Sequence, residues 1–319
     1  MGEPPVETTR LAPSPTGALH LGNARTFLVN WALARQRGWR IVLRIDDLDG
    51  PRIKAGAADQ AIETLRWLGL DWDEGPHHQS SDQTRYQDAL RSLIDAGQAY
   101  PCGCTRSQIL AASRSAPHDG DHELRYPGTC RPQEGVVASA TLLGDPKLAW
   151  RLRTPDVTVD FDDAFLGRQS HNPQREVGDF LIAAKGAAPG YQLAVVVDDA
   201  RQSVTQVVRG DDLVASTARQ LLLYDRLGLG VPPAYTHLPM VVGEDGRRLA
   251  KRHGDTRIDS YRDRGIAPER VIGLLAEWCG LGDRTPTTVE DFVRRFTLRG
   301  LPNERVVFSD TDDAWLVDG

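Results

Sequence analysis

The sequence predicts an α/β fold in which a parallel sheet is split by an insertion, then resumed and followed by a small helical region. Near the start, a short apolar strand, a turn, an amphipathic helix and a second apolar strand follow one another. This is the order of a right-handed parallel unit, whose ligands collect at the carboxyl ends of the strands. A segment rich in Cys, Pro, Gly and His then separates this unit from later apolar runs of the same kind.

Residues 1–100 are expected to form the first half of the sheet. The stretch TTRLAP favours a short strand, and the two prolines of the turn exclude helix as far as Gly17. Apolar residues at helical spacing predict a helix over residues 24–36, and IVLRIDDLD predicts a buried strand that ends in carboxylates. Helices are also expected at AADQAIETLRWLGL and DQTRYQDALRSLIDAG, the second with Asp82 as its N-cap.

An insertion is expected over residues 101–190. From 101 to about 135 no period is sustained, as expected where a metal replaces a core, and KLAWRLR and VTVDFDDAF then predict antiparallel strands. Residues 191–256 are expected to resume the parallel sheet. There, YQLAVVVDD at 191–199 and VTQVVRGDD predict buried strands, and LVASTARQLLLYDRLG predicts a helix.

Residues 257–319 are expected to form a small helical domain. The apolar pattern over residues 267–279 predicts a helix with Pro268 in its first turn. Thr287 and Glu290 fit a capping box at the start of a further helix that contains DFVRRF.

The composition is that of a folded soluble protein, with 40% hydrophobic and 26% charged residues. No apolar run approaches the roughly 18 residues that span a bilayer, and MGEPPVETTR lacks the pattern of a secretion signal. We therefore expect a cytoplasmic protein without membrane contact. The formal net charge of −6 means that any nucleic acid would have to bind a local basic face.

Two segments favour a site for the phosphates of ATP. In RLAPSPTGALHLGNART, the glycines permit close backbone approach at a helix N-terminus, and His20 could donate to a phosphate oxygen. The same turn also fits an ordinary connection with an exposed histidine. The loop GRRLAKRHG is cationic and follows the apolar strand THLPMVV, so it could close over the same phosphates or remain a solvated surface loop.

These motifs resemble a known family. PTGALHLGN is similar to the HIGH signature of class I aminoacyl-tRNA synthetases, and RLAKR is similar to their KMSKS signature. RIDDLD, VVVDD, VVRGDDL and IDSYRDRGIAPERVIGLLAEWCG resemble glutamyl-tRNA synthetases over nearly the whole chain. The resemblance implies a Rossmann-like parallel sheet split by a zinc-binding insertion and followed by a helical stem-contact domain. It also implies ATP with Mg²⁺ as a substrate.

The resemblance assigns the residues that bind ATP. His20 and Lys251 are the implied catalytic pair, Lys251 stabilising the charge on the pyrophosphate. The chain departs from the signatures at Asn23, the fourth HIGH place, and in RLAKR, where Arg248, Ala250 and Arg252 replace the first lysine and the two serines. The implied ATP-binding residues are Thr16, Gly17, His20, Gly22, Asn23, Arg248, Leu249 and Lys251.

L-Glutamate brings two carboxylates and one ammonium group, so its site needs cations and an acid. Arg10 and Arg209 suit carboxylates, Asp46 suits the ammonium, and Tyr191 offers a hydroxyl. An alternative for Arg209 is a salt bridge to a neighbouring aspartate, Asp211 or Asp212. Asp46 stands where glutamate enzymes usually carry glutamate. The glutamate-binding residues implied by the resemblance are Arg10, Leu11, Ala12, Pro13, Ser14, Asp46, Tyr191 and Arg209.

Three of the four cysteines, Cys102, Cys104 and Cys130, lie close together in the sequence and suggest one tetrahedral zinc site. From chemistry alone, the fourth ligand is His122 or His118. The family pattern of C-x-C followed by Y-x-x-x-C implies Tyr126 instead, with His122 as the alternative. Three buried thiols without a metal are a further possibility. Cys279 lies in an apolar run and is expected in the core.

The chain stops soon after the expected stem-contact region, without the anticodon-reading domain of glutamyl-tRNA synthetases. This resembles the glutamyl-Q tRNA(Asp) synthetases, which activate glutamate without tRNA and attach it to queuosine at the wobble position of tRNA(Asp). The expected enzyme is a monomeric ligase. The alternatives are a glutamyl-tRNA synthetase without its anticodon domain, a nucleotidyltransferase, and a non-catalytic zinc-bearing RNA-binding module. Arg294, Arg295 and Arg299 either contact tRNA phosphates or form a solvated face.

Overall fold

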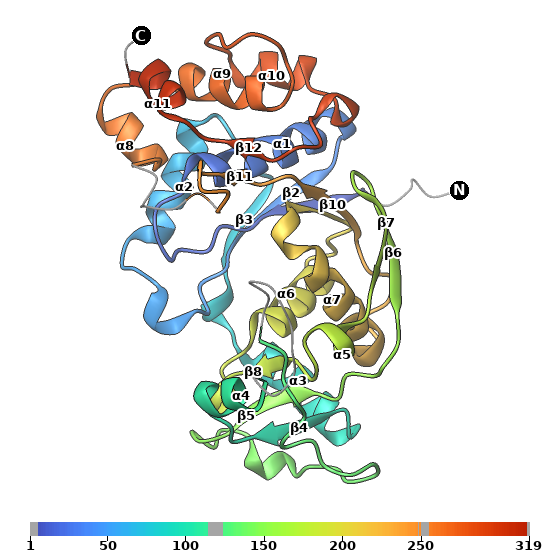
Figure 1. Ribbon diagram of the computed structural model, residues 1–319. Helices are drawn as coiled ribbons and strands as arrows, with labels where there is room; N and C mark the ends of the chain where they lie inside the picture. Colours follow the sequence, from blue (N-terminus) through green and yellow to red (C-terminus); the bar gives the residue numbers. More distant parts are fainter. Residues whose placement is uncertain (1–5, 114–123, 248, 250–254, 318–319) are drawn as a thin grey trace.

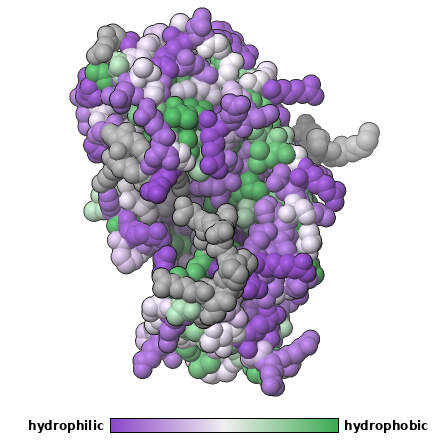
Figure 2. Space-filling view, in the orientation of Figure 1, coloured by the Kyte–Doolittle hydropathy of each residue, from purple (hydrophilic) through white to green (hydrophobic). Residues whose placement is uncertain are grey.

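The computed structural model describes residues 6–113, 124–247, 249 and 255–317. Figure 1 shows an elongated molecule with the C-terminal helices at one end, parallel strands in the middle, and a smaller antiparallel sheet at the other end. Hydrophilic side chains dominate the face drawn in Figure 2, with smaller apolar patches between them. No helix within the described ranges is long and apolar enough to cross a membrane.

The first half of the sheet has the predicted parallel order. Strands β1 (Thr8–Leu11), β2 (Arg40–Ile45) and β3 (Glu74–His78) lie in the order β1-β2-β3, and all pairs are parallel. Helix α1 (Leu21–Arg37) connects β1 to β2 and begins nearly one turn earlier than the sequence predicted, at the N-cap His20. It ends at Gly38, which adopts the left-handed conformation that favours glycine.

The insertion contains more regular structure than its composition indicated. Strands β4 (Ala99–Cys102), β5 (Ala149–Leu152) and β8 (Leu181–Ala183) form an antiparallel sheet, in which only β5 was predicted, from KLAWRLR. A helix, α4 (Arg106–Ser113), lies inside the stretch predicted to lack a period.

The helices before the insertion are α2 (Ala57–Trp67) and α3 (Thr84–Asp95). The N-cap of α3 is Gln83, so the prediction of Asp82 was wrong by one residue, although Asp82 Oδ1 accepts from Thr84 N.

The resumed sheet includes a hairpin that the sequence assigned to the insertion. Strand β6 (Val159–Asp163) pairs antiparallel with β7 (Gly167–His171) but also parallel with β10 (Ala234–Leu238), whose other neighbour is β9 (Gln206–Gly210). A backbone hydrogen bond of 2.8 Å from Thr205 N to Thr8 O joins the two sheets beside β9 and β1. The insertion is therefore connected to the resumed sheet through strand β6 of the β6–β7 hairpin.

The prediction of a strand over residues 191–199 was wrong, because this segment forms helix α6 (Tyr191–Arg201). A short apolar run is compatible with either a buried strand or a buried helix, and its β-branched residues favoured the wrong choice. The run is apolar because α6 packs between α3, α7 (Val214–Leu227) and β8. A one-turn helix, α5 (Pro173–Glu176), precedes it.

The last part of the chain is helical, as predicted. Its helices are α8 (Ile258–Asp263), α9 (Pro268–Trp278), α10 (Val289–Arg295) and α11 (Asp310–Val317). The N-cap of α10 is Thr288, whose side chain accepts from Asp291 N, so the capping box predicted at Thr287 and Glu290 was wrong.

Two contacts join these helices to the sheet. The short strands β11 (Val241–Val242) and β12 (Val306–Val307) pair in parallel. The buried Arg25 of α1 donates to the carbonyl of Pro239 at 2.6 Å and to that of Trp278 at 3.2 Å. Cys279 is buried in the same core, as expected.

Candidate active site

The histidine of the first motif caps helix α1. His20 Nδ1 accepts from Asn23 N at 3.4 Å, while Asn23 Oδ1 accepts from His20 N at 3.3 Å. Asn23, the departure from the fourth HIGH place, therefore has a structural role in starting the helix. Because Nδ1 accepts a hydrogen bond, the proton of a neutral imidazole lies on Nε2.

Gly22 allows the turn to pack closely. A Cβ atom at this position would lie 3.1 Å from His20 Cε1 and 3.3 Å from Val241 Cβ. At Gly17, by contrast, the nearest atom to an added Cβ would be Lys54 Nζ at 3.9 Å, an ordinary contact. A side chain at position 22 would thus push against both the imidazole and β11.

The histidine turn lies beside both described ends of the second motif. After the loop, Leu21 N donates to Thr256 O at 3.0 Å, and Ile258 N donates to Leu19 O at 2.9 Å. Within the loop, Leu249 N donates to Val241 O at 3.3 Å, and Val241 in turn lies beside Gly22 of the histidine turn. Arg248 and Lys251 lie outside the described residues. Leu249 is only 2% exposed and packs in the core, so its side chain is not available to a ligand.

The predicted glutamate residues gather at the strand ends, but their exposure differs. Ser14 Oγ donates to Asp46 O at 3.1 Å, and Asp46 N donates to Pro13 O at 3.0 Å, which ties the turn after β1 to the end of β2. Leu11 and Pro13 are buried, Ala12 is half-buried, and Thr16 and Ser14 are exposed. Tyr191, the first residue of α6, is 46% exposed.

Arg44 is a functional candidate that the sequence reasoning missed. Its side chain is 1% exposed, and it contacts Asp46 Oδ1 through Nε at 2.7 Å and Asp199 Oδ1 through Nη1 at 2.6 Å. Arg10 Nε donates to the same oxygen of Asp199 at 3.3 Å. An arginine inside an apolar strand and just before two aspartates was the available signal, because such a buried cation needs carboxylate partners.

The ion pairs of Arg10, Arg44, Asp46 and Asp199 leave some polar atoms available to a ligand. Within the described chain, Asp46 Oδ2 and the two terminal nitrogens of Arg10 make no hydrogen bond. Burial raises the pKa of Asp46, an effect that the adjacent Arg44 only partly offsets. Although burial alone would lower the pKa of Arg44, Asp46 and Asp199 raise it well above the ordinary value. The arginine is therefore a permanent cation behind the carboxylate.

Arg209 is held by neutral groups, and the alternative salt bridge to Asp211 or Asp212 was wrong. The side chain is 5% exposed and donates to His237 Nε2 at 3.0 Å. Its other hydrogen bonds go to Gln220 Oε1, Leu213 O and Thr217 Oγ1. Of its five N–H groups, one on Nη1 is left for a ligand.

The three cysteines form the expected cluster. Their Sγ atoms lie within 4.8 Å of one another, and Tyr126 Oη lies 3.5 Å from Cys102 Sγ. The guanidinium of Arg151 lies 3.7 Å from the centre of the Tyr126 ring and donates to Cys102 Sγ at 3.4 Å. Although burial alone would raise it, hydrogen bonds from Tyr126 and Arg151 lower the pKa of Cys102. Three thiols and one phenol oxygen are a donor set that suits zinc; His118 and His122 lie outside the described residues.

A family model described as "tRNA synthetases class I (E and Q), catalytic domain" matches residues 6–311. The chain belongs to this family. It is accordingly a ligase, and class I synthetases use ATP with Mg²⁺.

The synthetase is similar to two kinds of curated relative. A glutamyl-Q tRNA(Asp) synthetase of Symbiobacterium thermophilum is 47% identical over 93% of this chain and 94% of that protein. One of Rhodopirellula baltica is 47% identical over 85% of this chain and 84% of that protein. A glutamate-tRNA ligase of Geotalea uraniireducens is 41% identical over 96% of this chain, which spans 64% of that ligase.

Solved structures confirm the predicted fold class. A glutamate tRNA ligase of Elizabethkingia meningosepticum matches 98% of this chain with a TM-score of 0.79 and 24% identity, and the synthetase spans 68% of that ligase. The glutamate-tRNA synthetase of Elizabethkingia anophelis gives a TM-score of 0.80 over the same share of this chain.

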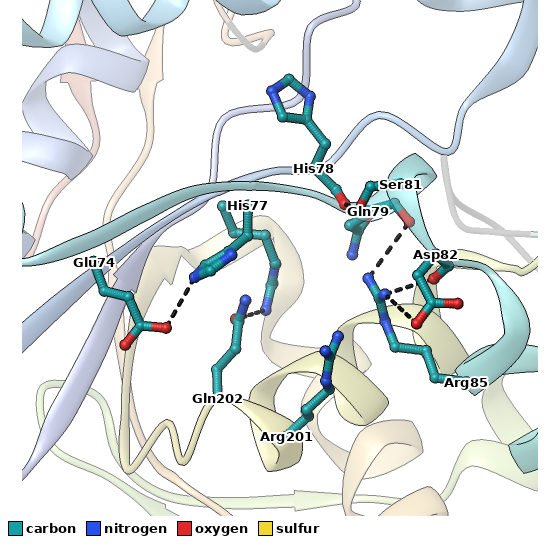
Figure 3. Close-up of a pocket in the computed structure, with 10 residues that line it drawn as sticks. Glu74, His77, His78, Gln79, Ser81, Asp82, Arg85, Arg201 and Gln202 are labelled. Atoms are coloured by element: carbon teal, nitrogen blue, oxygen red, sulfur yellow. Dashed lines mark hydrogen bonds and ion pairs between the residues drawn. The ribbon is translucent and has the colours of Figure 1, made fainter.

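A cavity of about 300 Å³ lies near the C-terminal end of α6, at the opposite end of this helix from Tyr191. Figure 3 shows Arg201 and Gln202 from this end and His77 from β3 around it, while the His78 ring points away. None of the predicted site residues lines this cavity. Arg44 connects it to the site, because it lines the cavity and contacts Asp46.

Proposed function

We propose that the synthetase activates L-glutamate with ATP in the absence of tRNA and transfers it to the queuosine base of tRNA(Asp). The observation that carries this proposal is the 47% identity to the Symbiobacterium glutamyl-Q tRNA(Asp) synthetase over 94% of that relative. The similarity to the Geotalea glutamate-tRNA ligase is lower, at 41%. The match to the family model, over residues 6–311, includes Arg10, Asp46 and Arg209, the residues proposed for glutamate.

In the first step, the glutamate α-carboxylate attacks the α-phosphate of ATP, a P–O bond forms, and pyrophosphate leaves with the bonding electrons. The chain contributes position and charge rather than a covalent intermediate. Nε2–H of His20, backbone amides of its turn and the ammonium of Lys251 stabilise the phosphate oxygens. Mg²⁺, when bound with ATP, neutralises part of the phosphate charge.

In the second step, a hydroxyl of the queuosine cyclopentene ring attacks the carbonyl carbon of glutamyl-adenylate. The ester bond forms, AMP leaves, and the hydroxyl proton passes to the phosphate of the adenylate. This route is proposed because none of the predicted site residues is an obvious general base.

Glutamate is held by three charged groups in this proposal. Asp46 Oδ2 accepts from the ammonium, since Oδ1 of the same carboxylate is occupied by Arg44. The terminal nitrogens of Arg10 and the remaining Nη1–H of Arg209 donate to the carboxylates. The hydroxyl of Tyr191 lies at the exposed start of α6 and completes the set. Aspartate, which is shorter than the glutamate usual at position 46, reaches the buried Arg44 and forms an ion pair with it.

We also propose one Zn²⁺ bound by Cys102, Cys104, Tyr126 and Cys130, which orders the insertion. The clustering of the three thiols and the position of the phenol beside Cys102 support this set. The synthetase is proposed to act as a monomer.

Contacts with tRNA phosphates are proposed for the last helical region. Arg294 is paired with Asp291, and Arg295 donates to the carbonyl of Leu281. Arg299 makes no hydrogen bond or ion pair within the described residues. Arg299 is therefore the first candidate for a phosphate contact, ahead of the two partnered arginines.

The test is glutamate-dependent exchange of labelled pyrophosphate into ATP without tRNA, followed by transfer of labelled glutamate. Exchange and transfer to tRNA(Asp) that contains queuosine, but not to tRNA(Asp) that lacks it, are expected. Charging of tRNA(Glu) at its 3′ end, or exchange that requires tRNA, would instead assign the activity of the glutamate-tRNA ligases. Absence of any glutamate-dependent exchange would contradict both.

A further inference from the structure

Three side chains form a row across adjacent strands of the resumed sheet. Asp163 ends β6, His237 lies in β10, and Arg209 lies in β9, where it is the register partner of His237. His237 Nδ1 lies 2.7 Å from Asp163 Oδ2, and Arg209 Nε lies 3.0 Å from His237 Nε2. The side chains of Asp163 and His237 have no exposed surface.

The row fixes the protonation of the histidine. Arginine can only donate, so His237 Nε2 must accept from Arg209, and the ring proton lies on Nδ1 and is donated to Asp163. Asp163 is held in turn by the backbone N–H groups of Phe165 at 3.0 Å and Leu166 at 2.8 Å. The imidazole is thus neutral, oriented from one side by a carboxylate and bonded on the other to a cation.

The partners of Arg209 leave its charge uncompensated. Arg10 and Arg44 share the carboxylate of Asp199, whereas no described carboxylate forms an ion pair with Arg209. Its acceptors, an imidazole, an amide, a hydroxyl and a backbone carbonyl, are all neutral. A buried cation without a counter-charge is costly, so this arrangement favours an anionic ligand at the free Nη1–H. A carboxylate in place of His237 would compete with that ligand.

We propose that Asp163 and His237 are positioning residues that hold Arg209 through a neutral contact and so keep its positive charge for a substrate carboxylate. The inference rests on the proposed role of Arg209 in binding glutamate. Through Asp163, the β6–β7 hairpin then contributes to the selectivity of the site for glutamate over glutamine.

Two variants at His237 distinguish the contact of Nε2 with Arg209 from the contact of Nδ1 with Asp163. In His237→Gln, the side-chain oxygen can occupy the place of Nε2 and accept from Arg209. In His237→Asn, the shorter amide keeps a donor near Asp163 but withdraws the acceptor from Arg209. Thr236→Ala, whose side chain points to the other face of β10, is the matched control.

The readouts are KM for glutamate, KM for ATP and kcat in pyrophosphate exchange. His237→Asn is expected to raise KM for glutamate about 10- to 100-fold, by analogy with the loss of a hydrogen-bond partner of a metal ligand. Its KM for ATP should stay unchanged, and its discrimination of glutamate from glutamine should fall. His237→Gln should recover most of the loss, and Thr236→Ala should match the wild type. Equal effects of Asn and Gln, or a parallel rise in KM for ATP, would assign His237 a purely structural role.

Amino-acid binding can also be measured without the proposed reaction. Calorimetry gives the affinities of the wild type and His237→Asn for glutamate and for glutamine. If the wild type binds glutamate but His237→Asn binds it equally well, the positioning role alone is overturned. If the wild type binds glutamate without activating it, the proposed reaction is wrong. The positioning role is then still tested by comparing glutamate binding by the wild type and by His237→Asn. If the wild type binds neither amino acid, both proposals fall.

Discussion

Arg44 lies 2.7 Å from Asp46, and the two form an ion pair in which the arginine is almost completely buried. The pair occupies one oxygen of Asp46 and leaves the other without a partner in the described chain. The carboxylate is therefore fixed in direction while half of its accepting capacity remains for a ligand. This is the arrangement expected for an acid that binds an ammonium group.

Asp46→Asn should weaken glutamate binding specifically. The change keeps the size of the side chain but removes a charge-assisted hydrogen bond, which contributes about 1.5–3 kcal/mol. We expect a rise of about 10- to 100-fold in KM for glutamate, by the same principle, with KM for ATP unchanged. Asp47→Asn is the control, because Asp47 contacts His78 and Ser80 instead. Equal effects of the two substitutions would refute the role of Asp46.

Gly22→Ala should lower activity without unfolding the protein. The new methyl group would lie 3.1 Å from His20 Cε1, so the imidazole must move by a few tenths of an ångström. Since misplacement by about 1 Å costs about 10²-fold, we expect a loss of roughly 10-fold in kcat for exchange. The unfolding free energy should change by less than about 1 kcal/mol. A variant with full activity would show that the imidazole position is not critical.

Lys251→Ala should slow pyrophosphate exchange by about 10²-fold, the usual cost of one preorganised charge donor. Arg247→Ala is the control within the same cationic loop. It should have little effect, because Arg247 lies before the signature-like RLAKR segment. Exchange by Lys251→Ala at the parent rate would remove the loop from the proposed mechanism.

Tyr126→Phe should lower the zinc content of protein dialysed against a weak chelator, because the phenol oxygen is the proposed fourth ligand. Metal analysis by atomic absorption measures the effect. Tyr100→Phe is the control: Tyr100 packs in the same cluster, but its hydroxyl donates to Asp179. If Tyr126→Phe keeps one zinc per chain and His122→Ala loses it, the ligand set contains the histidine.

His237 should make stability depend on pH. Burial, together with the nearby Arg209, lowers the pKa of His237 below 6.5, although hydrogen bonding to Asp163 opposes this shift and Asp211 also raises the pKa. Below about pH 6.5 the unfolded chain therefore binds a proton that the folded chain does not, and stability falls as the pH falls. Urea unfolding at pH 7.5 and 5.5 should show a larger loss for the wild type than for His237→Gln. Equal losses would mean that the imidazole takes up its proton in the folded protein.

The sequence was informative where chemistry is carried by local motifs. The turn of His20 before α1 and the clustering of Cys102, Cys104 and Cys130 were both predicted, because sequence motifs specify them, although α1 begins nearly one turn earlier than predicted. Arg44 and His237 were missed. Their contacts run between strands distant in the chain, and no local pattern states which strands are neighbours. The signal that remains is a charged or titratable residue inside an apolar strand, as in IVLRI and YTHL.

Arg25 is fastened at once to the segment after β10 and to the end of α9. Pivoting of the C-terminal helices away from the sheet would strip this buried guanidinium of the Trp278 carbonyl, at a cost of about 1.5–3 kcal/mol. This contact and the β11–β12 pairing together favour one angle between the two parts. A nucleic acid that contacts both parts would meet a surface whose shape these contacts already define.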